Sequence, residues 1–281
     1  MNTHPLTDAQ VKQFDDDGYL ICRGYYDAEE MKLLLQTARA DHTMLDHNIP
    51  IKDAKGRQSK LSLWNHPGDD IYGMISRGHR MVDAMEQLLK DEVYHYHSKM
   101  MLKEPKVGGA WEWHQDYGYW YQNGCLLPDM CSGLIAVDRA TKENGCLQLL
   151  RGSQKMGRVE HGRFGEQTGA DPERVEEAKK RFELVYFEAE PGDVLFFHGN
   201  TLHASAPNTS ANPRWSLICC YNTKTNDPYK ESHHPRYTPL KKVDDDMIKK
   251  VGAKGTSAEQ RSFLNPAEDK TIGAGKQKQT T

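Results

Sequence analysis

The chain has 281 residues, of which 37% are hydrophobic, and its formal net charge is −3 at pH 7. Its lysines and arginines are scattered, which argues against a nucleic-acid-binding surface, and no apolar run approaches the ~18 residues that a membrane span needs. Because the N-terminal residues lack the apolar stretch of a signal peptide and the six cysteines show no C-x-x-C spacing, we expect a cytoplasmic protein, monomeric or homodimeric, without nucleic-acid or membrane partners.

The first ninety residues predict a mainly helical region. Residues 7–10 have the pattern of a capping box and open a short helix, which a strand at residues 19–22 follows. Asp27 begins a second helix with an apolar face, and residues 71–90 carry methionines and leucines at helical spacing. The polar residues 46–60 are expected to form a loop.

After residue 91 the pattern changes to short β-rich runs that glycine, proline and asparagine separate. Strands are expected at residues 93–102, 132–137, 146–150, 184–187, 194–197 and 215–221. A charged helix from Asp171 to about Phe182 interrupts them, with proline in its favoured first turn. Many short strands with turn residues between them indicate a barrel or a sandwich.

This pattern predicts one domain over residues 1–251. It consists of a helical part at about 5–90, a β core at about 91–222 and a polar loop at 223–240. Residues 252–281 are rich in lysine, glutamine, glycine and threonine and are expected to form a flexible tail.

The segment Trp113-His114-Gln115-Asp116 places a histidine and a carboxylate two residues apart. On an extended strand the two side chains point to the same side and can reach one metal ion. A third ligand must come from elsewhere, and His198 and His203 are the candidates. We favour His203, because a strand that ends near residue 199 would place it closer to the mouth of a barrel.

Two histidines and one carboxylate form the ligand set of oxygen-activating non-haem Fe(II). Zn²⁺ is the alternative metal, but catalytic zinc sites of this type usually carry a nearby glutamate base, as in H-E-x-x-H helices, and no such motif is present. A hydrogen-bonded His–Asp pair without metal is the other alternative, since the chain contains 13 histidines. The combination of the two histidine motifs with a downstream arginine favours the metal site.

That arginine is Arg214, at the start of a predicted strand. A guanidinium binds a carboxylate bidentately and stays charged when it is buried, which suits a 2-oxo acid that chelates iron through its other end. Ser205 can add a hydroxyl to the same carboxylate. A surface arginine in a turn is the alternative.

Taken together, His114-x-Asp116, His203-x-Ser205 and Arg214 resemble the phytanoyl-CoA hydroxylase (phytanoyl-CoA dioxygenase) family of Fe(II)/2-oxoglutarate-dependent oxygenases. Further matching segments are residues 138–147, 151–153 and 191–197 and the pattern Phe14-x-x-x-Gly18-Tyr19. The resemblance covers roughly residues 8–222. The chain departs from the family at Gln154, where many members have histidine, but this position is not a metal ligand.

The resemblance implies a mainly β fold, a double-stranded β-helix (a cupin-like jelly roll) wrapped by N-terminal helices. It implies Fe(II), 2-oxoglutarate and O₂ as requirements, with ascorbate helpful in vitro. The metal-binding and catalytic residues would be His114, Asp116 and His203, and the co-substrate-binding residues would be Arg214, Ser205, Lys99 and Lys60. An exposed loop lysine is the alternative interpretation of Lys60.

The resemblance also implies a reaction. Related halogenases replace the metal-binding carboxylate with a small residue, so the retained Asp116 favours hydroxylation, or desaturation, of an unactivated C–H bond in a small-molecule metabolite, with release of succinate and CO₂. A non-catalytic 2-oxoglutarate or metal sensor on the same fold is one alternative, because a fold does not determine function. A cupin-like metal enzyme that uses no 2-oxo acid is another.

Aromatic residues are frequent around the H-x-D motif. Barrel packing is the interpretation that we favour, and an aromatic wall for an apolar or cationic substrate group is the alternative. The candidates for substrate contacts are Trp113, Tyr117, Trp120 and His97. His95 and His97 are expected to share one strand face, and residues 226–239 to form either a substrate-facing lid or a docked surface loop.

Overall fold

The structure is a computed structural model that describes residues 5–255 and 262–264. Its strands are β1 (Tyr19–Cys22), β2 (Ile49–Lys52), β3 (Gln58–Trp64), β4 (Val93–Lys103), β5 (Trp111–His114), β6 (Met130–Ala136), β7 (Leu147–Leu150), β8 (His161–Phe164), β9 (Gln167–Ala170), β10 (Leu184–Tyr186), β11 (Val194–His198), β12 (His203–Ser205) and β13 (Arg214–Thr223). Its α-helices are α1 (Asp8–Asp17), α2 (Ala28–Ala40), α3 (His42–Asp46), α4 (Ile71–Arg77), α5 (His79–Leu89), α6 (Asp116–Trp120), α7 (Pro172–Lys179) and α8 (Met247–Gly252). None of the helices in the described part of the chain is long and apolar enough to cross a membrane.

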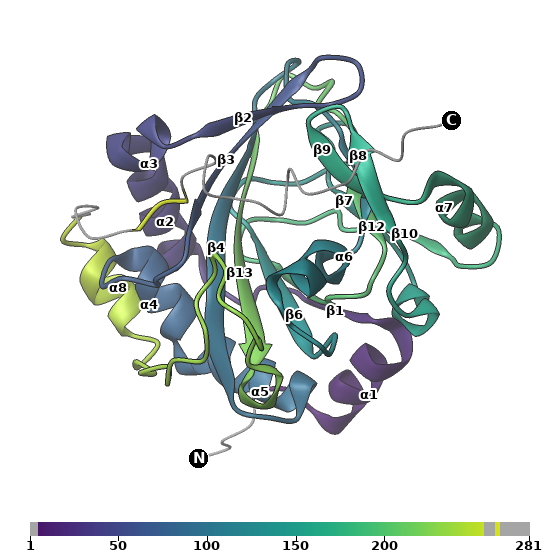
Figure 1. Ribbon diagram of the computed structural model, residues 1–281. Helices are drawn as coiled ribbons and strands as arrows, with labels where there is room; N and C mark the ends of the chain where they lie inside the picture. The colour runs from purple at the N-terminus through teal and green to yellow at the C-terminus, as the bar shows by residue number, and fades with distance from the viewer. Residues whose placement is uncertain (1–4, 256–261, 265–281) are drawn as a thin grey trace.

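Two antiparallel sheets form the centre of the molecule. The larger has seven strands in the order β1-β11-β6-β13-β4-β3-β2, and the smaller has the order β10-β7-β12-β5. Helices α2, α4, α5 and α8 cover the outer face of the larger sheet, and α7 lies beyond the smaller one (Figure 1). The mainly β fold with flanking helices is as expected.

Strand β11 illustrates how the two cores form. Val194 and Phe196 pack in the core between sheet and helices, whereas Leu195 and Phe197 pack in the core between the two sheets. Because side chains alternate along a strand and both faces are covered, β11 reads as a continuous apolar run. The space between the sheets is therefore apolar, and any polar side chain that enters it is notable.

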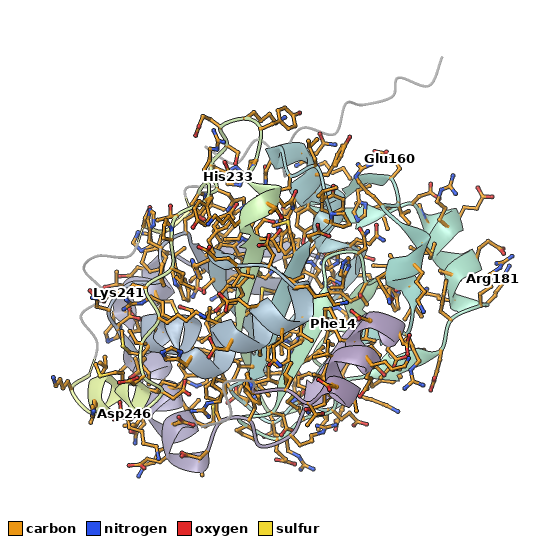
Figure 2. The ribbon with its side chains drawn as sticks, turned by 90° about the horizontal axis from the view of Figure 1, so that it is seen from below. Phe14, Glu160, Arg181, His233, Lys241 and Asp246 are labelled. Carbon is orange, nitrogen blue, oxygen red and sulfur yellow. The ribbon has the colours of Figure 1, made fainter. Side chains whose placement is uncertain are left out.

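The local signals of the N-terminal region predict its helices correctly. Thr7 caps α1 with a reciprocal Gln10 contact, and Asp27 caps α2 in the same way. The helical pattern at residues 71–90 is interrupted at Gly78, which separates α4 from α5. Asp171 likewise caps α7, which Figure 2 shows near Arg181, on the opposite side of the molecule from Lys241 and Asp246.

The prediction of a loop at residues 46–60 is wrong. Strands β2 and β3 pair there as an antiparallel hairpin, with Ile51 opposite Ser59, and β3 pairs with β4. The apolar positions of this hairpin alternate with lysine, serine and glutamine, and that dilutes the hydrophobic signal. Pairing with β4, which comes later in the chain, decides that the segment is extended.

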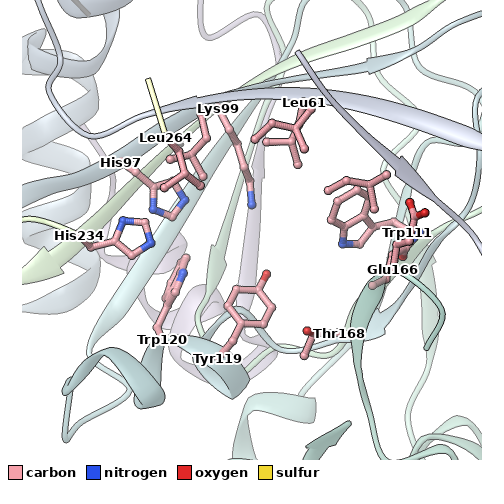
Figure 3. Close-up of a pocket in the computed structure, with 14 residues that line it drawn as sticks. Leu61, His97, Lys99, Trp111, Tyr119, Trp120, Glu166, Thr168, His234 and Leu264 are labelled. Carbon is pink, nitrogen blue, oxygen red and sulfur yellow. The ribbon is translucent and has the colours of Figure 1, made fainter. Parts of the chain in front are cut away.

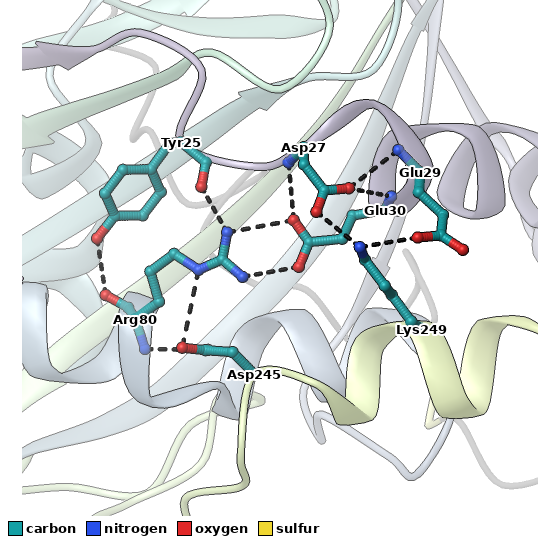
Figure 4. Close-up of polar contacts among 7 residues, drawn as sticks. All are labelled: Tyr25, Asp27, Glu29, Glu30, Arg80, Asp245 and Lys249. Carbon is teal, nitrogen blue, oxygen red and sulfur yellow. Dashed lines mark hydrogen bonds and ion pairs between the residues drawn. The ribbon is translucent and has the colours of Figure 1, made fainter.

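Helix α2 is anchored to its neighbours by Arg80 of α5 (Figure 4). The guanidinium pairs with Glu30 at 2.7 Å and donates to the carbonyl of Tyr25 at 2.5 Å. Lys249 of α8 pairs with Asp27 at 2.7 Å and so joins a third helix to the same place. These contacts hold the helical layer against the outer face of the larger sheet.

Three residues of the expected flexible tail lie against the sheet. The backbone N–H of Leu264 donates to the carbonyl of Leu63 on β3 at 2.8 Å, and the Phe263 ring stacks on His47 with centroids 4.3 Å apart. The expectation therefore differs from the structure at residues 262–264. Residues 256–261 and 265–281 lie outside the described residues.

Candidate metal centre and adjoining cavities

The predicted metal ligands meet between the two sheets. Strand β5 ends at His114 and helix α6 begins at Asp116, so the strand that we expected to include both residues stops two residues early. Gln115 is still extended (φ −112°, ψ 134°), which keeps His114 and Asp116 on the same side. His203 begins β12 directly opposite His114 in the strand register.

His114, Asp116 and His203 each offer a ligand atom within 4.8 Å of the others, and all three are buried. The Nε2 atoms of His114 and His203 lie 3.6 and 3.8 Å from Oδ1 of Asp116. This donor set fits a divalent metal ion that keeps open coordination positions. His198 lies outside the cluster, where it packs against Phe14 and accepts a hydrogen bond from the backbone of Asn200.

Backbone carbonyls fix the orientation of both histidines. Nδ1 of His114 lies 2.7 Å from the carbonyl of Glu112, and Nδ1 of His203 lies 2.9 Å from that of Thr201. Nδ1 must therefore carry the proton, and Nε2 presents its lone pair to the cluster. Burial lowers the pKa of His203 to about 3, which keeps this imidazole neutral and able to bind metal.

Asp116 is held in its ionised form. Tyr119 donates to Oδ1 at 2.7 Å and Ser132 donates to Oδ2 at 2.9 Å. Burial would raise the pKa of Asp116, but the Lys99 charge and the His114 contact together hold it well below its usual range. An ionised carboxylate beside two imidazoles completes a site for a divalent cation.

Gln115 points away from the cluster, as predicted, and ties down the surrounding loops. Its side chain donates to the carbonyls of Gly157 and Asn200 and accepts from the backbone of Val159. Its backbone N–H donates to Nε2 of His161 at 2.9 Å. Sequence reasoning did not identify His161, whose role depends on a loop brought from 46 residues away.

Arg214 is buried, with 5% of its surface exposed, and shares a cavity with His114 and His203. Its two terminal nitrogens donate to Ser216 Oγ at 2.9 Å and to the carbonyl of Gly145 at 2.8 Å. Its Nε has no hydrogen-bond partner among the described residues. The interpretation as a surface arginine is therefore wrong, and the guanidinium retains a donor for an anion.

Lys103 is a site residue that sequence reasoning missed. It is fully buried and donates to Ser205 Oγ at 2.7 Å and to the carbonyl of Ala206 at 2.5 Å. Burial, with the Arg214 charge as the next cause, holds the pKa of Lys103 well below its usual range. The sequence could have indicated Lys103, because it lies four residues after Lys99 and therefore on the same face of β4.

The two lysines predicted from the resemblance lie in different places. Lys99 lines the cavity that contains Arg214 and also a second, larger cavity. Lys60 is exposed, and on β3 it is adjacent in sequence to Leu61, which lines the larger cavity, so that its side chain points to the other face. The structure does not bring Lys60 to the site.

Figure 3 shows the larger cavity and the side chains that line it. Side chains from β2, β3, β4, β5, α6 and the β8–β9 hairpin line it, together with two residues from the C-terminal part of the chain. They are Ile49, Ile51, Leu61, Leu63, His97, Lys99, Trp111, Tyr119, Trp120, Glu166, Gln167, Thr168, His234 and Leu264. Trp111 and Lys99 line both cavities, so the two meet beside the metal ligands.

A family model described as phytanoyl-CoA dioxygenase (PhyH) matches residues 14–216, which is most of the chain. This chain belongs to the phytanoyl-CoA dioxygenase family. The family expected from the motifs, and with it the oxidoreductase class, is confirmed.

Named relatives of this phytanoyl-CoA dioxygenase family member include hydroxylases. An L-proline trans-4-hydroxylase from Streptomyces griseoviridis is 29% identical over 266 residues, which cover 87% of this chain and 98% of the relative. An ectoine dioxygenase from Sphingopyxis alaskensis is 25% identical over 240 residues, which cover 80% of this chain and 78% of the relative. The solved structure of EctD from S. alaskensis with bound Fe has a TM-score of 0.73 at 23% identity, covers 87% of this chain and 89% of that chain, and shows the same fold.

Two of the four candidates for substrate contacts, Trp113 and Tyr117, do not line either cavity. Trp113 packs against the α7 region, with the Lys179 ammonium 5.3 Å from its ring. Tyr117 donates to the carbonyl of Leu126 at 2.6 Å and is buried in the core between the sheets. Packing explains both, whereas Trp120 and His97 do line the larger cavity.

His95 and His97 do not share a face as expected. The register between β4 and β13 shifts so that Cys220 is opposite His97 and Tyr221 is opposite His95. The extra residue, Tyr96, forms a β-bulge that turns His97 into the larger cavity, while His95 remains against Tyr221 in the helix-side core.

Proposed function

We propose that this protein binds Fe(II) through His114, Asp116 and His203 and is a 2-oxoglutarate-dependent hydroxylase. It would use O₂ and 2-oxoglutarate to hydroxylate an unactivated C–H bond of a small-molecule metabolite, with release of succinate and CO₂. The observation that carries the proposal is that two residues of the metal cluster, His114 and His203, line one cavity with the buried Arg214 and its unpartnered Nε.

The cavity with Arg214 suits the distal carboxylate of 2-oxoglutarate. Arg214 supplies the charge and a free N–H, and Ser205 supplies a hydroxyl. Because Ser205 Oγ accepts a hydrogen bond from Lys103, its own proton is free to point at the carboxylate. Lys103 therefore acts as a positioning residue for Ser205.

Bound iron, 2-oxoglutarate and O₂ together would supply the oxidising chemistry. The chain orients two imidazoles, holds the Asp116 carboxylate with hydrogen bonds from Tyr119 and Ser132, and buries the centre between two sheets. Retention of Asp116 keeps a carboxylate where a halide would otherwise bind, which favours hydroxylation.

The larger cavity is the place for the substrate. It shares Lys99 and Trp111 with the cavity that His114 and His203 line, and most of its lining is apolar or aromatic. The named relatives act on L-proline and on ectoine, both small molecules, which supports a small metabolite here as well.

The test is succinate formation by the purified protein in air with Fe(II), ascorbate and 2-oxoglutarate, alone and with a panel of small metabolites. We expect succinate, and more of it with a true substrate. Absence of succinate under every condition would refute the proposal, and 2-oxoglutarate binding without turnover would indicate a sensor.

Arg214→Ala tests the co-substrate site. Loss of the guanidinium should raise the KM for 2-oxoglutarate by at least about 10-fold, the equivalent of about 1.4 kcal/mol, because a charged hydrogen bond is lost. The matched control is Arg139→Ala, at an exposed arginine that pairs with Glu190 and lines neither cavity. An unchanged KM in Arg214→Ala would remove this residue from the site.

A further inference from the structure

His97 is the most unusual polar side chain in the larger cavity. Only 2% of its surface is exposed, and neither ring nitrogen has a hydrogen-bond partner among the described residues. Buried polar groups are nearly always hydrogen-bonded, so two unpartnered nitrogens on one ring that lines a cavity point to a missing ligand. Figure 3 shows the ring at the cavity wall beside His234.

His234 holds this ring in place. The two imidazoles stack with centroids 4.9 Å apart and an interplanar angle of 24°. Nδ1 of His234 lies 3.1 Å from Oδ1 of Asn65, which fixes the second ring. Burial holds the pKa of both histidines well below the usual range, so each is neutral and His97 presents one N–H donor.

Lys99 brings a positive charge to the same wall. It follows His97 by two residues on β4 and points into the cavity (Figure 3). It is half-buried, and no carboxylate among the described residues forms an ion pair with it. Its charge is a further cause, after burial, that lowers the pKa of His97 and of His234.

The residues that line the cavity form no ion pair with Lys99, whose charge also stabilises the ionised Asp116 of the metal cluster. The wall made by β2 and β3 is apolar, with Ile51, Leu61 and Leu63. Glu166, the acidic residue in the lining, is exposed and accepts a hydrogen bond from the backbone of Lys52 at 2.8 Å. The β4 wall of the cavity therefore carries a cation that no lining residue pairs with and an imidazole without a hydrogen-bond partner.

We propose that His97 and Lys99, with His234 stacked behind, form the subsite for a carboxylate of the primary substrate, which is therefore a small carboxylic acid. One oxygen accepts from the His97 N–H and the carboxylate charge faces the Lys99 ammonium. A single lysine matches a single negative charge, and the apolar part of the substrate packs on Leu61 and Trp111. This inference rests on the proposed function, because it assumes that the larger cavity holds the substrate.

Matched pairs of ligands test the subsite. Binding of L-proline and L-prolinamide, and of further small amino acids and their primary amides, is measured by anaerobic calorimetry with protein that holds Fe(II) and 2-oxoglutarate. We expect at least one acid to bind at least 10-fold more tightly than its amide. Amides that bind as tightly as the acids, or a panel in which no acid binds, would overturn the proposal.

Variants then assign the preference to His97. His97→Phe keeps the ring but removes both nitrogens, so it should weaken binding of the preferred acid at least 10-fold and abolish the preference over the amide. His97→Gln retains a donor and should restore part of the affinity. The control is His66→Phe, at an exposed histidine outside both cavities, with thermal unfolding measured for every variant.

An acid preference that survives in folded His97→Phe would contradict the assignment. The two proposals fail separately. Succinate formation without any acid preference removes the subsite alone, and acid preference without succinate formation removes the hydroxylase proposal alone.

Discussion

Tyr119 supports the candidate metal centre from the cavity side. Its hydroxyl donates to Oδ1 of Asp116 at 2.7 Å, and its ring lies nearly parallel to that of His114, with centroids 5.8 Å apart. It therefore touches two of the three candidate ligands. Groups that orient metal ligands in this way affect both metal affinity and turnover.

Tyr119→Phe removes the hydrogen bond to Asp116 and keeps the ring contact. We expect iron affinity or turnover to fall about 10–100-fold, because the carboxylate loses the donor that orients it. Iron dissociation constants and the rate of succinate formation measure the effect. Tyr121→Phe is the control, since that ring is 42% exposed and packs on Arg158. Equal behaviour of the two variants would mean that the Tyr119 hydroxyl has no role at the metal.

The turn before β7 shows how an element positions a charged group. Asn144 accepts from the backbone of Thr141 at 2.8 Å and donates to the carbonyl of Arg139 at 2.9 Å. The turn then passes through Gly145, whose φ of +77° is strained for other residues. The carbonyl of Gly145 accepts from Arg214, so this turn sets the position of the guanidinium.

Gly145→Ala tests the turn. Its Cβ would lie 2.1 Å from the carbonyl oxygen of Ala206, which accepts from Lys103, so the backbone around the co-substrate cavity must shift. We expect a higher KM for 2-oxoglutarate in succinate assays and a lower free energy of unfolding in urea. The matched control Gly165→Ala has φ +60° and no atom within 4 Å of its Cβ.

The control Gly165→Ala should lower the free energy of unfolding by about 1–2 kcal/mol, because alanine is strained in the left-handed backbone conformation. Gly145→Ala should lower the free energy of unfolding by at least about 1 kcal/mol more than the control, because overpacking adds to the backbone strain. Equal losses, with an unchanged KM, would show that the turn does not position Arg214.

At the scale of the whole molecule, buried histidines link stability to pH. Burial lowers the pKa of His161 and of His198 to about 4, and that of His95 to about 3. The unfolded chain binds these protons near pH 6.5, so it takes up more protons than the folded protein as the pH falls from 6.5 towards 4. The free energy of unfolding therefore decreases over this window.

His198→Gln should make the free energy of unfolding decrease less as the pH falls. A histidine with a folded pKa of about 4 removes about 2 kcal/mol of stability between pH 7.5 and 5, and the variant should lose that much less than the wild type. Urea unfolding of the metal-free proteins at both pH values measures the difference. His42→Gln, at an exposed histidine, is the control. The same pH dependence in His198→Gln and wild type would contradict the prediction.

The sequence by itself determined the features that depend on near neighbours in the chain. The caps at Thr7 and Asp27 join atoms three residues apart, and the apolar run of β11 reports burial on both of its faces. His114 and Asp116 point to one side because a single extended residue separates them. These contacts need no partner from elsewhere, so motif and pattern are sufficient to predict them and the family.

Only the tertiary structure decided which polar side chains enter the space between the sheets. The bulge at Tyr96 turns His97 inward because β13, more than a hundred residues later, sets the register of β4. Lys103 becomes a site residue because β12 brings Ser205 to it, and Lys60 is excluded because the β2–β3 hairpin turns it outward. A strand's own sequence does not set its register, since shifting the pairing by one residue exchanges the two faces.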